Sequence, residues 1–187
     1  YSLWNTITSY VPTLKPYEKK IFDENCQFEI NIKNLDPVFN IFYPPLHIAP
    51  GTALSGEINS MTKHIDLFLS SPLVTWNDMR CEGLAIKGVD NKGKFDFVTN
   101  MQNFFLAPNI PIEKVTIDGN SDNQSAYIKL AIHDVDTATN KLVFAFNSEF
   151  RNDGITSIHI EPSTLVKVDT MLWKFNDENS TIYDANG

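Results

Sequence analysis

Residues 26–33 read CQFEINIK, and this stretch marks the point where the periodicity of the chain changes. Its apolar residues occupy every second position, which is the pattern of a β-strand with one buried face. Upstream, apolar residues recur at intervals of three and four, which is the pattern of a helix. The change divides the chain into a helical N-terminal segment, 1–25, and an antiparallel β domain, 26–187.

The helical segment contains two prolines, Pro12 and Pro16. Proline removes a backbone donor and clashes with the preceding turn, so it ends or kinks a helix. We therefore expect a first helix over residues 2–10 and a short turn or second helix over 13–20.

The β domain shows short runs of alternating apolar residues that are separated by turn-forming residues. A helical turn is expected in LDPVFNIF, residues 35–42, before Pro44 and Pro45. The expected strands lie near residues 28–32, 54–58, 65–69, 74–76, 81–86, 95–97, 115–117, 126–132, 142–146, 158–160 and 165–175. The expected turns lie at residues 59–60, 77–78, 90–93, 118–122, 137–140 and 152–154.

Short strands in such close succession predict a mainly β fold, an antiparallel meander with a short N-terminal helical segment. The meander either closes into a sandwich or barrel, or stays an open, curled sheet whose apolar face lines a groove. Strand periodicity does not separate the two. The stretch EPSTLVKVDTMLWKF, 161–175, is expected to form a strand pair in this sheet, with Trp173 packing on its apolar edge.

The composition excludes some classes of partner. Fifteen Lys and Arg residues stand against 23 Asp and Glu residues, which gives a formal net charge of −8. Phosphate binding needs a basic surface, so neither nucleic acid nor electrostatic attraction to anionic lipid head groups is expected. No apolar run is long enough for a membrane span and no signal peptide is visible, so we expect a segment of a longer protein.

The cysteines and histidines predict no metal site. Cys26 and Cys81 match no metal-binding spacing, and the sequence leaves open whether they form a disulfide or are two small buried residues. The four histidines are scattered, without the i, i+2 or i, i+4 pairs of a metal site. His64 and His133 fall on the polar side of their strands, so both are expected to be solvated.

Two acidic stretches match a functional site only in part. DGNSD, 118–122, fits the first ligand positions of a calcium loop, but Asn123 and Lys129 stand where that loop needs Gly and Glu. Asp134 and Asp136 could form a carboxylate pair, although glycoside hydrolysis needs two acids that face one cleft. No catalytic motif is present, and we expect no enzyme activity, no metal and no cofactor.

The order of several short motifs resembles a known family. The chain reads FEINIKNLDPVF, then PPLHIAPGTALSGEINS, then HIDLFLSSPLVTWND, and finally PSTLVKVDTMLWKF. This order, from about residue 25 to the C-terminus, is similar to the β-repeat portion of the TamB branch of the AsmA-like proteins in Bacteroidetes-type bacteria. In the last motif, Lys167 stands where that family more often has an apolar residue.

The resemblance implies a long periplasmic protein, anchored in the inner membrane by a helix outside this chain. The family is linked to phospholipid transport between the inner and outer membranes and to assembly of outer-membrane proteins. The implied partners are phospholipid acyl chains and outer-membrane assembly proteins, and no catalytic residue is implied. The residues expected to line the lipid path share the apolar phase of their strands: Ile65, Leu67, Leu69, Phe95, Phe97, Ile128, Leu130, Ile132, Leu142, Phe144 and Phe146.

An alternative hypothesis is a secreted or surface β-sandwich that binds glycan or protein. Trp4, Trp76 and Tyr127 could stack on sugars if they shared one exposed face. The two hypotheses differ in where the apolar side chains lie, because sugar binding needs coplanar aromatic rings in solvent and lipid binding needs aliphatic and aromatic side chains inside a trough.

Overall fold

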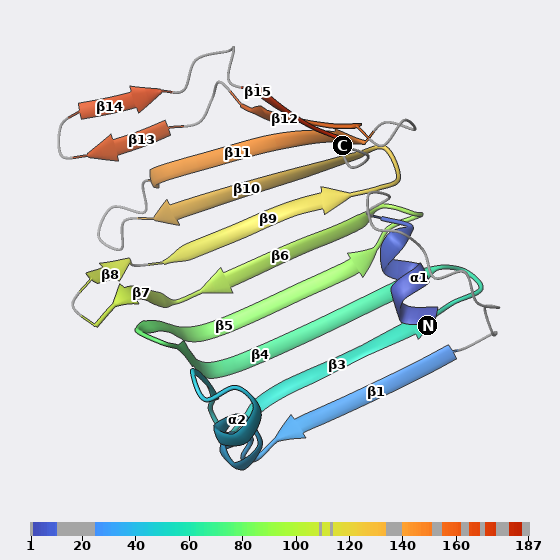
Figure 1. The fold of residues 1–187 in the computed structure, drawn as a ribbon, viewed down its shortest axis with the longest axis vertical. Helices are drawn as coiled ribbons and strands as arrows, with labels where there is room; N and C mark the ends of the chain where they lie inside the picture. The colour runs from blue at the N-terminus through green and yellow to red at the C-terminus, as the bar shows by residue number, and fades with distance from the viewer. Residues whose placement is uncertain are drawn as a thin grey trace.

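The protein folds into one antiparallel β-sheet with a short helix near its N-terminus (Figure 1). The computed structural model describes residues 2–10, 25–108, 110–112, 114–133, 140–150, 155–161, 165–168, 171–174 and 180–184. The elements within these residues are α1 (Ser2–Thr8), β1 (Asn25–Ile32), α2 (Asp36–Phe42), β2 (Leu46–Ile48), β3 (Thr52–Asn59), β4 (His64–Trp76), β5 (Met79–Asp90), β6 (Phe95–Met101), β7 (Asn103–Ala107), β8 (Ile110–Ile112), β9 (Val115–Ser121), β10 (Ser125–His133), β11 (Asn140–Phe150), β12 (Ile155–Ile160), β13 (Leu165–Val168), β14 (Met171–Lys174) and β15 (Ser180–Asp184).

The strands follow one another across the sheet almost in chain order, as in a meander. The path runs β1-β3-β4-β5-β6-β9-β10-β11-β12-β15. The remaining strands attach beside it: β2 pairs with β4, the β7–β8 hairpin with β5, and the β13–β14 hairpin with β11. The path begins at β1 and ends at β15, so the sheet is open (Figure 1). The alternative of a closed sandwich or barrel is therefore wrong for the described residues.

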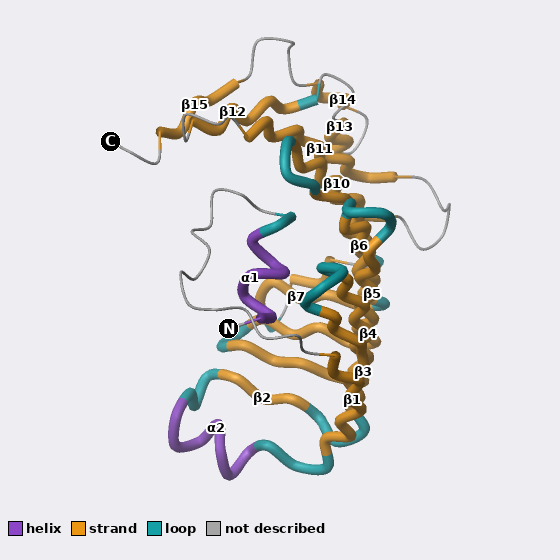
Figure 2. The backbone as a smooth tube through the Cα atoms, turned by 90° about the vertical axis from the view of Figure 1, so that its right-hand side faces the viewer, coloured by secondary structure: helices purple, strands orange, loops and turns teal. Residues whose placement is uncertain are grey.

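The sheet is curled, and α1 lies on its concave side. Figure 2 looks along the strands and shows β12 and β15 at one end, and α2 at the other, bending toward the side that holds α1. We call the face that carries α1 the inner face and the opposite one the outer face. The curl follows from the twist and coiling that neighbouring strands impose on a large sheet.

Few apolar side chains are fully buried, because the fold has a single layer. Among the residues whose burial is described, the apolar ones with less than a tenth of their surface exposed are Tyr10, Ile65, Cys81, Val115, Ala131 and Ala145. Most other strand side chains are half-buried. Lateral packing between neighbouring strands and the backbone hydrogen bonds of the sheet thus stabilise this fold, rather than a core between two layers.

One predicted break between strands is wrong. Residues 65–69 and 74–76 belong to one strand, β4, although Pro72 lies between them. Proline is tolerated because β3 pairs with β4 only up to Ser70 and β2 only from Val74, so Pro72 faces a gap between these partners.

The predicted turn at residues 118–122 is also wrong, since Asp118 to Ser121 belong to β9. The turn begins at Asp122, whose Oδ1 accepts hydrogen bonds from the backbone N–H groups of Gln124 and Ser125 at 2.8 Å each. Partial burial opposes ionisation of this carboxyl, but the backbone donors lower its pKa. With its first residues in a strand, the stretch does not form a calcium loop.

Most of the other sequence predictions are confirmed or lie outside the described residues. The helix over 2–10 and the helical turn over 35–42 are confirmed as α1 and α2. The strand pair over 165–175 is confirmed as the β13–β14 hairpin. The possible second helix over 13–20, residues 137–139 of the turn predicted at 137–140, the turn at 152–154 and the side chain of Trp173 lie outside the described residues. The short strands β2, β7, β8 and β15 were not predicted.

Candidate functional site

The strand register places the eleven predicted apolar residues on one face of the sheet. Residues directly opposite each other in an antiparallel pair share a face, and so do every second residue along a strand. One row of opposite residues crosses six strands, through Leu67, Gly88, Phe97, Gly119, Ile128 and Phe146. A second, parallel row passes through Leu69, Ile86, Thr99, Ile117, Leu130 and Phe144.

The remaining predicted residues extend these two rows along their strands. Ile65 and Phe95 each lie two residues from a member of the first row. Ile132 and Leu142, which are opposite each other, lie two residues beyond Leu130 and Phe144. The eleven side chains therefore form one apolar surface.

This surface is the inner face, because it carries α1. A hollow of about 510 Å³ lies between α1 and the sheet. Its residues are Ile7, Tyr10, Ile65, Leu67, Phe95, Phe97, Asn120, Ser121, Ala126, Ile128, Phe146, Ser148 and Phe150. Six of the eleven predicted residues thus line the hollow. The other five, Leu69, Leu130, Ile132, Leu142 and Phe144, lie further along the same face.

The hollow has an almost wholly apolar lining. Its polar side chains are those of Ser121 and Ser148 and the hydroxyl of Tyr10, while Asn120 borders it although its side chain belongs to the outer phase of β9. Among the described residues, no charged one lines the hollow. Burying a charge without a partner costs far more than burying a methylene group, so such a lining favours an uncharged, apolar guest.

Glycines shape the inner face, and the sequence analysis did not single them out. Gly88 and Gly119 occupy the first row, and Gly56, which is opposite Leu67, continues this row onto β3, so that the glycines alternate with Leu67 and Phe97. A Cβ on Gly119 would lie 2.2 Å from the backbone oxygen of Tyr127 and 3.0 Å from Cζ of Phe97. A Cβ on Gly88 would lie 2.3 Å from Cζ of Phe95. Large side chains therefore pack over the glycines, and a glycine inside a strand pattern was the available signal.

The C-terminal end of α1 is attached to the sheet by hydrogen bonds. The hydroxyl of Tyr10 lies 2.6 Å from the backbone oxygen of Lys63 and 2.8 Å from Oδ1 of Asp90. Oγ of Ser121 donates to the backbone oxygen of Tyr10 at 2.5 Å. Tyr10 is 4% exposed, and the centroid of its ring lies 5.5 Å from that of the Phe95 ring. Burial, together with the hydrogen bond to Asp90 and its charge, raises the pKa of Tyr10 well above its usual range.

His64 joins the same cluster beside the hollow. Its Nδ1 lies 3.3 Å from Asp90 and its Nε2 lies 3.4 Å from Asp66. Partial burial opposes protonation, but the two carboxylates outweigh it and raise the pKa of His64. His64 keeps about a third of its side chain exposed, as expected for a solvated histidine, but it is also paired with carboxylates: Asp66 lies two residues along the same strand and Asp90 on the neighbouring β5. His133 is half-buried at the end of β10.

We expect the Tyr10→Phe substitution to loosen α1. It removes the single hydroxyl proton that the Asp90 carboxylate and the backbone oxygen of Lys63 share as acceptors, and loss of such a hydrogen bond to a charged group costs about 2 kcal/mol. Limited proteolysis within α1 should accelerate accordingly. The control is Tyr43→Phe, because Tyr43 is exposed and its hydroxyl accepts one hydrogen bond, from Nε1 of Trp76. Equal proteolysis of the two variants would contradict this role of Tyr10.

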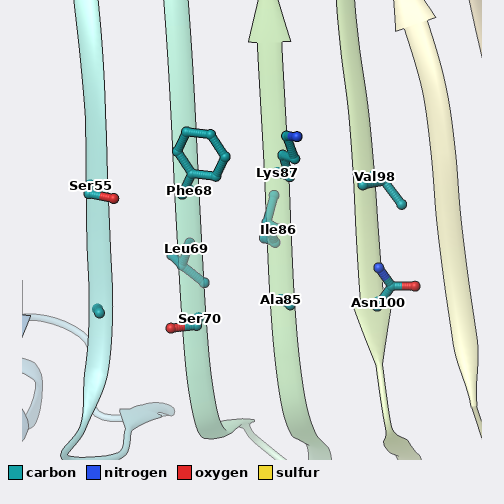
Figure 3. Close-up of a pocket in the computed structure, with 10 residues that line it drawn as sticks. Ser55, Phe68, Leu69, Ser70, Ala85, Ile86, Lys87, Val98 and Asn100 are labelled. Carbon is teal, nitrogen blue, oxygen red and sulfur yellow. The ribbon is translucent and has the colours of Figure 1, made fainter.

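The outer face carries a second, smaller hollow of about 290 Å³ (Figure 3). The side chains of the outer phase that line it are Ala53, Ser55, Phe68, Ser70, Ala85, Lys87, Val98 and Asn100. Leu69 and Ile86 also border this hollow, although their side chains belong to the inner phase of β4 and β5. The small side chains of the outer phase create the depression, and Nζ of Lys87 lies 5.7 Å from the centroid of the Phe68 ring. This lining mixes polar and apolar groups and contains no pair of groups that could act as acid and base.

The structure brings the other sequence candidates into no common site. Both cysteines are free, with Cys26 exposed and Cys81 buried, where burial raises the pKa of its thiol. Asp134 and Asp136 lie outside the described residues. Within the described part of the chain, no group of three or more His, Cys, Asp or Glu side chains could hold a metal ion. None of the described helices has the length and apolar character needed to cross a membrane.

The three aromatic residues of the sugar-binding hypothesis lie on different parts of the fold. Trp4 is on α1, Trp76 ends β4, and Tyr127 on β10 is opposite Asn120 and Asn147, in the outer phase of its strand. They form no coplanar platform. No protein-family model, no curated protein and no solved structure matches the chain.

Proposed function

We propose that the inner face binds the acyl chains of phospholipid, with the hollow beneath α1 as one binding position. The observation that carries this proposal is the 510 Å³ hollow, lined without charge, on a continuous apolar face of an open sheet. Its volume lies within the range of about 300–1,000 Å³ that is usual for ligand pockets. Each methylene group moved from water onto such a surface contributes about 0.8 kcal/mol.

The wider role follows from the resemblance to the TamB branch. The chain would serve as one segment of a periplasmic conduit that carries phospholipid between the inner and outer membranes. Two features support this role: the apolar face crosses the sheet from strand to strand, and the sheet is open at β1 and β15. A face of this kind accepts acyl chains without specific ligand chemistry, which suits transport of many lipid species.

A second candidate function is assistance in assembling outer-membrane proteins. The observation that favours it is the open edge at β1, which in the described part of the chain pairs on one side only, with β3. An unpaired edge offers backbone donors and acceptors to another β-strand.

A crosslinking experiment tests the proposed lipid path. A photo-crosslinkable residue at Leu130, on the inner face, is expected to capture phospholipid in cells. The matched control is the adjacent Lys129, which is opposite Asp118 and Ala145 on the outer face. Equal labelling at both positions, or none at either, would overturn the lipid proposal. Capture of protein instead of phospholipid would favour the assembly function.

A further inference from the structure

Helix α2 turns an apolar stripe toward solvent. Val38, Ile41 and Phe42 are spaced i, i+3 and i+4, so they lie on one side of the helix. They are 48%, 74% and 79% exposed, whereas Phe39 on the other side is half-buried. A surface helix of a globular fold normally turns its apolar stripe inward. The exposed stripe therefore indicates an interaction outside the fold.

Two aromatic residues extend this stripe. Tyr43 follows the helix and Trp76 ends β4, and they are 46% and 48% exposed. Nε1 of Trp76 donates to the hydroxyl oxygen of Tyr43 at 3.0 Å, so the polar ends of the two side chains contact each other. Tyrosine and tryptophan with an apolar ring and a satisfied polar end are enriched where protein meets the membrane–water interface.

The segment that carries the stripe has no charged side chain of its own. Residues 37–46 read PVFNIFYPPL and contain no charged side chain. The preceding Asp36 contacts Nδ1 of His47 through Oδ1. Insertion of this segment into an apolar phase therefore does not require the removal of an isolated charge from water.

The position and shape of the segment fit a lipid surface. Figure 1 shows α2 at the opposite end of the strands from α1, and Figure 2 shows it protruding beyond the sheet. A protruding apolar segment can enter a deformable layer of lipid, whereas a rigid protein partner would need a cavity that matches its shape. The net charge of −8 opposes an anionic surface and leaves a zwitterionic one as the favoured partner.

We propose that Val38, Ile41, Phe42, Tyr43 and Trp76 form a knob that docks the protein on a zwitterionic phospholipid bilayer. The three residues of the helical stripe enter the boundary between head groups and acyl chains, and the two aromatic rings lie at the level of the head groups. This inference goes beyond the proposed function, because the knob contains no residue of the hollow beneath α1.

Vesicle flotation tests the knob. The chain is expected to float with phosphatidylcholine vesicles, and Ile41→Asp or Phe42→Asp should each weaken this binding about tenfold or more. The matched control is Met61→Asp, since Met61 is 70% exposed in the turn between β3 and β4, at the other end of these strands. It should float like the unmodified chain. Adding phosphatidylglycerol to the vesicles should not strengthen binding.

Three results would overturn the docking proposal. The first is that the unmodified chain does not float with the vesicles. The second is that Met61→Asp weakens flotation as much as Phe42→Asp does. The third is that Phe42→Asp dissociates an oligomer in gel filtration but leaves flotation unchanged. The last result would assign the knob to a second copy of the chain. Binding of a soluble fluorescent fatty acid, measured on the same variants, reports on the hollow alone, so failure of the knob and failure of the proposed lipid path remain distinguishable.

Discussion

Replacing Ile128 with Asp is expected to abolish binding of a fluorescent fatty acid to the inner face. Ile128 lines the hollow beneath α1, and none of the described residues that line it is charged. A carboxylate there must lose water when an acyl chain enters, at a cost of several kcal/mol. The affinity should therefore fall about a hundredfold or more, since each 1.4 kcal/mol is about a factor of ten.

The control for this loss is Lys129→Asp. Lys129 follows Ile128 in the sequence but lies on the outer face, so this substitution should leave the affinity for the fatty acid unchanged. Because an unfolded Ile128→Asp chain would also fail to bind, circular dichroism must show that its strand content is retained. Ala126→Phe provides a second variant, since it fills the same hollow with an apolar side chain. Fatty-acid binding that persists in both variants would contradict the proposed site.

Gly119→Ala is expected to cost about 3 kcal/mol of the free energy of unfolding. The new Cβ would lie 2.2 Å from the backbone oxygen of Tyr127 and 3.0 Å from Cζ of Phe97. A backbone oxygen held in the ladder between β9 and β10 cannot rotate away as a flexible side chain would, so the strands must separate. Overpacking of this kind usually costs about 1–3 kcal/mol, and the backbone contact places this case at the upper end.

Urea denaturation measures the effect, as a lower midpoint with an unchanged slope. The control is Gly93→Ala, in the turn between β5 and β6, where a Cβ would meet nothing within 4 Å. Its φ of +85° is unfavourable for alanine, so this control should lose only about 1 kcal/mol. Equal losses in the two variants would contradict the close packing over Gly119.

The sequence by itself determined the class of fold and the apolar phase of the strands. Alternation is a local property, because successive side chains of a strand point to opposite faces whatever the strand pairs with. The residues CQFEINIK therefore predict a strand. In the same way, local alternation alone predicts that Ile65, Leu67 and Leu69 lie on one face, whichever strands pair with theirs. The sequence predicted two strands, 65–69 and 74–76, where the structure has one, because the tolerance of Pro72 inside β4 depends on where β3 ends and β2 begins.

Only the tertiary structure decided what lies against the apolar face. The same alternation occurs in the strands of a closed sandwich and of an open sheet, because the period of a strand does not indicate whether a second layer covers its apolar face. The covering of the hollow depends on Tyr10 reaching Asp90, which is 80 residues away in the chain. The glycine row likewise arises from register across strands. Contacts of this kind depend on how distant segments are aligned, and no local pattern of residues specifies that alignment.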